Sequence, residues 1–268
     1  WLIVQSAPGR LHQEYDFRSE REIVERSAGA NETALEEAID PTPEELEQKM
    51  SGSAFDIVHL AGVDVHQGLE LLQATASAFE LKRFVLPWVH ETDHYEGYIL
   101  SGGDRVLQPI GAQWLATLLC SGSLPPRIVT CNIYNSAYQI GKALVAAGIE
   151  SAIGFQDTFD DQLAEEFFAT FFRVLPAAEW NSIAAFNYAW QQIRARKSPL
   201  QGSGLVLWTT LKLEDTSLID EAVIRQHTLT AVELSRQNVR DLLQVDISPI
   251  AELNYSILHN NGPLFREF

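Results

Sequence analysis

Two histidines flank the end of an apolar segment in the stretch DIVHLAGVDVHQG, residues 56–68. His59 lies inside the apolar run, and His66 follows the glycine that ends it. Catalytic groups of α/β proteins gather at the carboxyl ends of strands, and an imidazole placed there can act as a general base. The first question is therefore whether either histidine is a catalytic base.

A second apolar run, RIVTCNI at residues 127–133, contains Cys131 and leads directly into polar residues. If the two runs are strands of one parallel sheet, the side chains behind them meet at one edge. We expect that cleft to hold Asp64, His66, Gln67, Tyr134, Asn135, Ser136, Gln156 and Asp157. Such a cluster can bind a polar ligand, perform acid–base chemistry, or serve as a hydrogen-bonded remnant that keeps the loops ordered.

Strands and helices that alternate along the chain must position these residues. Short apolar runs predict strands at 1–6, 33–39, 55–62, 83–89, 96–101, 127–133, 151–156 and 205–213. Amphipathic or mixed-charge segments predict helices at 16–27, 109–120, 136–147, 160–175, 180–196 and 217–244. Thr42, Pro43 and Glu45 form a capping-box pattern at the start of a further helix. The alternation predicts an α/β fold with a mostly parallel sheet and helices on both faces.

Composition narrows the classes of function. The 268 residues carry a net charge of -17, which argues against nucleic-acid and membrane partners because phosphates would be repelled. Cys120 and Cys131 form neither a disulfide framework nor a metal-ligand set, and we expect no metal and no cofactor. The cytoplasm is the default compartment. The first residue is Trp1, so we expect a processed or excised piece of a longer protein.

Several stretches, in the right order, resemble the CHAT domain, a bacterial caspase- and separase-like fold of cysteine peptidases. PTPEELEQKMSGSAFDIVHLAG is similar to the helix and strand before that family's histidine motif, and PPRIVTCNIYNSA to the strand before its cysteine motif. GKALVAAGIESAIGFQ and LVLWTTLKL resemble later units, so the likeness covers roughly residues 1–213. The resemblance implies a three-layer caspase-like sandwich over residues 1–216, with 217–268 as a helical extension.

The catalytic positions of that family are replaced in this chain. Its Gly-His-Gly triplet reads Gly62-Val63-Asp64 here, which puts Val63 at the position of the base. An ungapped match at the second strand puts Tyr134 at the position of the nucleophile. A cysteine needs a nearby base to become a thiolate. Replacement of both the base and the nucleophile is therefore the pattern of a peptidase site that has lost its activity.

Three functions follow as hypotheses. The first is a pseudo-peptidase that acts as an interaction or regulatory domain in a bacterial signalling or defence system. The resemblance implies protein partners, or appended repeat or nucleotide-triphosphatase modules, for such a domain. The second is an active cysteine endopeptidase in which Cys131 works with His59 or His66. The third is a sensor of a small polar ligand.

The two residues of the displaced dyad also have simpler interpretations. Cys131 lies within an apolar strand, where a buried cysteine packs as a small core residue. His59 lies four residues before Val63, about 13 Å along a strand, and is expected to be a hydrogen-bonded structural residue. His66 is expected either in a solvated loop or in the cleft.

Overall fold

The computed structural model describes residues 1–13, 15, 17–30, 34–75, 97–103, 106–195, 204–212, 248–249 and 265–267. The chain forms two compact units, Trp1–Asp220 and Glu221–Phe268. In the second unit, β9 (Ser248–Pro249) pairs in antiparallel fashion with β10 (Phe265–Glu267).

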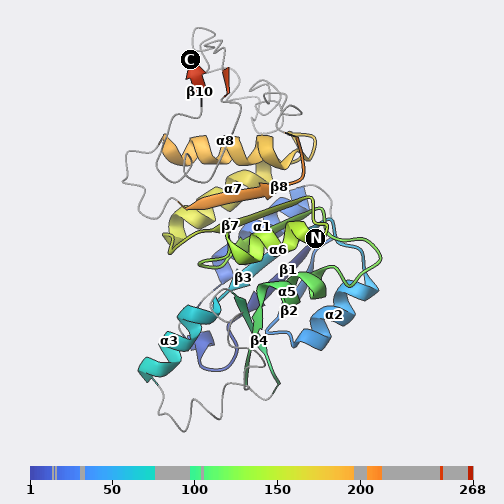
Figure 1. Ribbon diagram of the computed structural model, residues 1–268, viewed down its shortest axis with the longest axis vertical. Coiled ribbons are helices and arrows are strands. Elements are labelled where there is room, and N and C mark those ends of the chain that lie inside the picture. The colour runs from blue at the N-terminus through green and yellow to red at the C-terminus, as the bar shows by residue number, and fades with distance from the viewer. Residues whose placement is uncertain are drawn as a thin grey trace. The chain divides into compact units, whose positions relative to one another are not determined.

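A six-stranded sheet forms the centre of the first unit (Figure 1). Its strands are β1 (Leu2–Ser6), β2 (Glu36–Ile39), β3 (Ile57–Gly62), β6 (Ile128–Asn132), β7 (Ser151–Phe155) and β8 (Leu205–Thr209). Their order is β2-β1-β3-β6-β7-β8, and every pair is parallel except β7 with β8. All five residues of β1 are buried, because this strand lies between β2 and β3.

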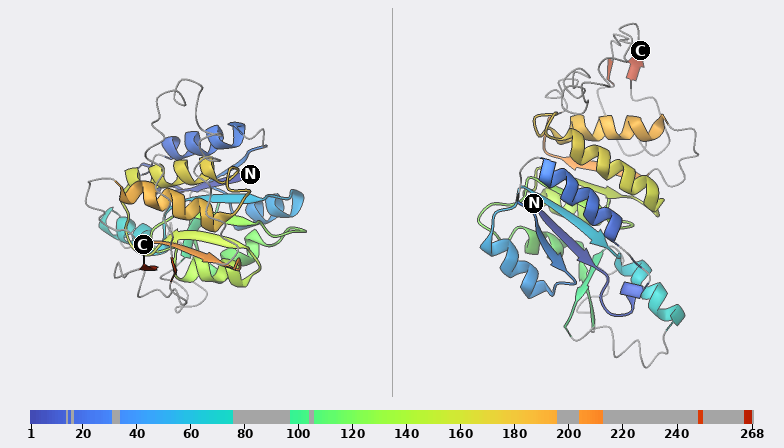
Figure 2. Two further views of the ribbon diagram at one scale, coloured as in Figure 1. Left: turned by 90° about the horizontal axis from the view of Figure 1, so that it is seen from above. Right: turned by 180° about the vertical axis from the view of Figure 1, so that it is seen from behind.

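Helices cover both faces of the sheet (Figure 2). On one face, α1 (Arg18–Ala30) and α8 (Ser182–Arg194) both pack against α7 (Asp161–Val174). On the other face, α5 (Ala112–Leu119) packs against α2 (Pro43–Gly52) and α6 (Gln139–Ala146). The predicted α/β class with a mostly parallel sheet and two helical layers is confirmed.

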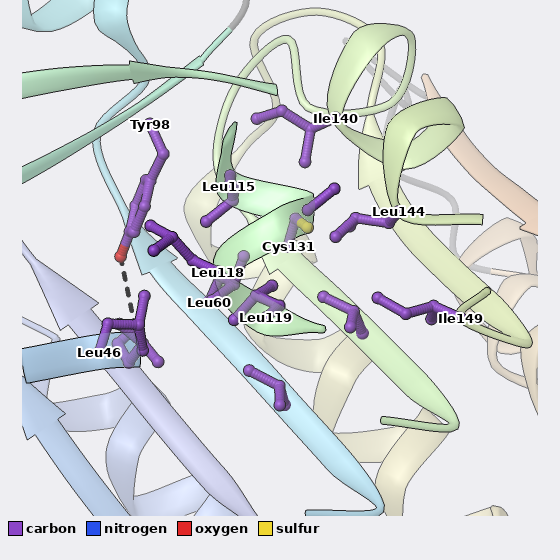
Figure 3. Close-up of a cluster of buried hydrophobic side chains, with 14 of the residues drawn as sticks. Leu46, Leu60, Tyr98, Leu115, Leu118, Leu119, Cys131, Ile140, Leu144 and Ile149 are labelled. Carbon is purple, nitrogen blue, oxygen red and sulfur yellow. Dashed lines mark hydrogen bonds between the residues drawn. The ribbon is translucent and has the colours of Figure 1, made fainter. Parts of the chain in front are cut away.

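The period-2 alternation of the strands divides the core into two layers. Leu60 and Cys131 are paired neighbours on β3 and β6, and both point toward α5 and α6 (Figure 3). His59 and Thr130, one residue earlier on each strand, are also paired and point toward α1 and α7. The register between β3 and β6 thus determines which residues of the two strands can meet.

Local signals fix the ends of two helices. The capping box at α2 is confirmed: Thr42 Oγ1 accepts a hydrogen bond from Glu45 N, and the Glu45 carboxylate accepts one from Thr42 N. Asp160 caps α7 through its Oδ1, which accepts a hydrogen bond from Leu163 N. α7 therefore begins at Asp161, beside the loop that follows β6.

One predicted helix is wrong at its start. Residues 109–120 were expected to be helical throughout, but Leu107–Gly111 forms β5, and α5 begins only at Ala112. β5 pairs with β4 (Gly97–Ser101), and Gly102 N donates to Val106 O in the turn between them. Pro109 fits this two-stranded ladder because it lies at a sheet edge, where a missing N–H is tolerated.

Two further expectations lie outside the described residues, namely the strand at 83–89 and the helix at 217–244. No helix in the described ranges is long and apolar enough to cross a bilayer.

Candidate functional site

The end of β3 places Gly62, Val63 and Asp64 in three different surroundings. A Cβ on Gly62 would lie 2.5 Å from Ser6 O and 2.7 Å from Cε2 of Tyr98, so only glycine lets the chain pass here. Val63 is fully buried in a small apolar cluster with Ala7, Leu11, Val65, Ile99 and Leu107. Val63 is therefore held by apolar packing at the end of β3.

Asp64 carries the buried carboxylate of this strand end. Its Oδ1 accepts a hydrogen bond from Gln67 N at 3.0 Å and caps α3 (Val65–Thr75). Its Oδ2 accepts one from Asn135 Nδ2, also at 3.0 Å. Burial raises the pKa of the Asp64 carboxyl, and the hydrogen bonds from Asn135 and Gln67 oppose that rise.

The loop after β6 supplies the other half of the site. Asn135 has a left-handed backbone, with φ of 56°, a conformation that asparagine tolerates better than most residues. That turn lets its side chain reach Asp64, which lies 71 residues earlier in the chain. The two strand ends are thus joined by one side-chain hydrogen bond.

Tyr134 lies in the same loop and is half-buried. Its hydroxyl donates to Asp161 Oδ1 at 3.2 Å, at the first residue of α7. Burial, followed by the nearby Asp161 carboxylate, raises the pKa of Tyr134 to about 12. At neutral pH the phenol is therefore protonated, and its hydroxyl donates the hydrogen bond to Asp161.

Ser136 is structural. It is fully buried; its Oγ donates to Ile133 O at 2.6 Å and accepts a hydrogen bond from Phe155 N at 3.0 Å. These bonds fasten the loop after β6 to the end of β7. The expected helix at 136–147 consequently begins later, at Gln139.

His66 lies beside the Asp64–Asn135 pair, because its backbone N–H bonds to the Asp64 carboxylate, whereas Gln156 and Asp157 have other partners. His66 projects from α3 with its side chain 52% exposed, and its Nε2 lies 3.1 Å from Glu70 Oε1 in the next turn. Gln156 is held through its backbone by Gly204, and exposed Asp157 accepts a hydrogen bond from Thr158 N.

His59 is a buried structural residue. Its Nδ1 lies 2.7 Å from Thr130 Oγ1, and its Nε2 lies 2.6 Å from Oε1 of the buried Glu20 in α1. The edges of Phe168 and Phe172 in α7 pack against the imidazole ring at centroid distances of 5.1 and 5.5 Å. The ring therefore ties β3 to α1 and lies beneath α7.

Cys131 is a core residue on the opposite face of the sheet. It is fully buried near Leu118, Ile140 and Leu144 (Figure 3), and burial raises the pKa of its thiol to about 12. The predicted pairing of Cys131 with His59 is wrong, because paired residues Leu60 and Cys131 point one way and His59 points the other. His66 instead lies 3.1 Å from Glu70 Oε1 with its side chain 52% exposed, while Cys131 is fully buried.

The candidate residues predicted from the sequence did not include four partners in these networks, namely Glu20, Tyr98, Thr130 and Asp161. Tyr98, for example, is fully buried and donates its hydroxyl to Ala61 O at 2.7 Å, beside the glycine that ends β3. Among the residues that the structure describes, no group of three or more His, Cys, Asp or Glu side chains is placed to hold a metal ion.

The sequence model of the CHAT domain matches residues 11–213, which is most of the chain. A search of curated proteins found no match. The match spans both strand ends described above, and the three-layer arrangement agrees with the caspase-like fold of that family. The chain therefore belongs to the CHAT family.

Proposed function

We propose that this CHAT domain has lost the peptidase dyad and works as an interaction or regulatory module. The observation that carries the proposal is the pair Val63 and Tyr134, which the resemblance puts at the positions of base and nucleophile. Valine cannot take a proton, and a phenol with a pKa of about 12 is a poor nucleophile at neutral pH.

The surroundings of both residues support this proposal. Val63 is packed into an apolar cluster, and Tyr134 is hydrogen-bonded to Asp161. The Asn135 amide donates a hydrogen bond to the Asp64 carboxylate between the two strand ends. The arrangement suits a hydrogen-bonded remnant that keeps both loops ordered.

The proposed setting is a bacterial signalling or defence system in the cytoplasm. Protein partners, or repeat or nucleotide-triphosphatase modules linked to the domain, would be its binding partners. The net charge of -17 favours protein over nucleic acid or membrane as partner.

A cleavage assay tests the loss of activity. The purified protein is incubated with candidate partner proteins and with a fluorogenic peptide library, and products are read by mass spectrometry. We expect no cleavage by the protein, and no labelling by a peptide ketone that traps catalytic cysteines. Cleavage that disappears in a Cys131→Ala variant of preserved fold would overturn the proposal.

The ligand-sensor hypothesis has less support from the geometry. The side-chain oxygens of Asp64 and Ser136 already bond within the protein, which leaves fewer convergent groups for a ligand. A thermal-shift screen with nucleotides and polar metabolites tests it. A ligand that raises the melting temperature of the protein, but not of Tyr134→Phe, would favour a sensor.

A further inference from the structure

The outer edge of β2 ends the six-stranded sheet on the side away from β8. Glu36 N donates to Trp1 O and Asp40 N donates to Gln5 O, so these residues face β1. Backbone groups alternate in direction along a strand, and the N–H and C=O groups of Glu37 and Ile39 therefore point outward. Within the described ranges no strand pairs with them.

A groove of about 470 Å³ runs beside this edge, between β2 and α2. Its lining combines the strand end with the outer side of the helix: Ala38, Ile39, Pro41, Glu45, Gln48 and Lys49. Ile39 is 57% exposed although it is a large apolar residue in a strand. An outward-facing backbone beside an exposed apolar side chain is what strand addition uses, with the backbone giving affinity and the groove giving side-chain selectivity.

We propose that this edge binds an extended, basic segment of another protein, which adds to the sheet beside β2. Carboxylates outnumber basic side chains along the edge and the start of α2. The carboxylates are Glu36, Glu37, Asp40, Glu44 and Glu45, and the bases are Arg21 and Lys49. A strand that alternates Lys or Arg with apolar residues would match both the surplus charge and Ile39.

A second copy of this chain fits the edge poorly in the two-fold antiparallel registers centred on Glu37, Ala38 and Ile39. Centred on Ala38, the pairing sets Glu36 against Asp40 of the copy, and centred on Glu37, it sets that glutamate against itself. Like charges directly opposite each other destabilise a strand pair. Centred on Ile39, it sets Glu37 against Pro41, which has no N–H to donate. The edge thus disfavours its own copy and leaves a basic strand as the complementary occupant.

The test uses a fluorescent peptide that alternates lysine with valine, with a glutamate–valine peptide as the control. We expect saturable binding of the first peptide alone, and weaker binding as salt is raised. Ile39→Pro removes the outward donor and spares the ladder to β1, so it should weaken binding about tenfold or more. Ile39→Val keeps the donor and should bind like the unchanged protein.

Amide hydrogen exchange locates the bound peptide on the unchanged protein, so the result does not depend on whether a variant folds. The amides of Glu37 and Ile39 should exchange more slowly with the lysine–valine peptide, and not with the control. Three results would overturn the inference. The peptide could protect another segment, Ile39→Pro could bind the peptide equally well with an unchanged circular dichroism spectrum, or the protein could form a dimer that Ile39→Pro abolishes. The inference does not depend on the lost dyad, since strand binding and peptide cleavage are read separately by anisotropy and mass spectrometry.

Discussion

The reactivity of Cys131 distinguishes a core cysteine from a displaced nucleophile. Replacing Cys120 by alanine leaves Cys131 as the single thiol, because the chain has two cysteines. At pH 8 a thiol of pKa 9.0 is about one-tenth thiolate, whereas one of pKa about 12 is about one ten-thousandth thiolate. Ionisation alone therefore slows labelling about a thousandfold, and complete burial slows it further.

The assay follows release of the coloured thiolate from a disulfide reagent with Cys120→Ala. Labelling of the folded protein should be slower than that of a free thiol by at least that factor. The same sample unfolded in guanidinium should react rapidly and completely, which controls for a damaged thiol. Labelling of the native protein at the rate of a free thiol, with the fold intact, would refute the burial of Cys131 and reopen its role as a nucleophile.

Three substitutions test the buried polar groups and the position that the family resemblance assigns to the base. Because burial raises the pKa of Asp64, stability contributed by its protonated form is lost as pH rises from 3.8 through the raised native value. Asp64→Asn, with the Asn135 amide reversed, should keep both hydrogen bonds and remove this dependence from urea unfolding curves. Val63→His buries an imidazole among apolar side chains and should lower the free energy of unfolding, measured with urea, by about 1–3 kcal/mol. An unchanged free energy of unfolding would show that this side chain reaches the cleft. Glu20→Ala leaves the buried His59 ring without its Glu20 partner and should lower the free energy of unfolding by about 1–3 kcal/mol, whereas loss of an exposed partner would lower it by less than about 1 kcal/mol.

The layered fold could be predicted from the sequence because its strands and helices carry clear hydrophobic periods. The α2 capping box likewise fixes a boundary through residues close in the chain. The β4–β5 hairpin was not predicted, because PIGAQWLATLLC has the apolar pattern of one helix. The pairing of Gly97 with Gly111 cannot be seen in that pattern.

The convergence of the two strand ends was predicted, but the actual partners were not. Asn135 meets Asp64 as the parallel topology requires. Which face each strand residue occupies depends on the register that pairs Leu60 with Cys131, and period-2 alternation alone cannot supply that register. Glu20 lies in a mixed-charge helix where several carboxylates look alike in sequence, so nothing there identifies it as the partner of His59.

The buried position of β1 sets the smallest part of the chain that can fold by itself. The family match begins at residue 11, after β1 has ended at Ser6. Yet Leu2, Ile3 and Val4 are fully buried, and β1 bridges β2 to β3. A fragment that begins at the family limit would lose an interior strand and leave two facing rows of unpaired backbone groups, which invites aggregation. The boundary of the recognisable family sequence and the boundary of the autonomous folding unit are therefore different places in this chain.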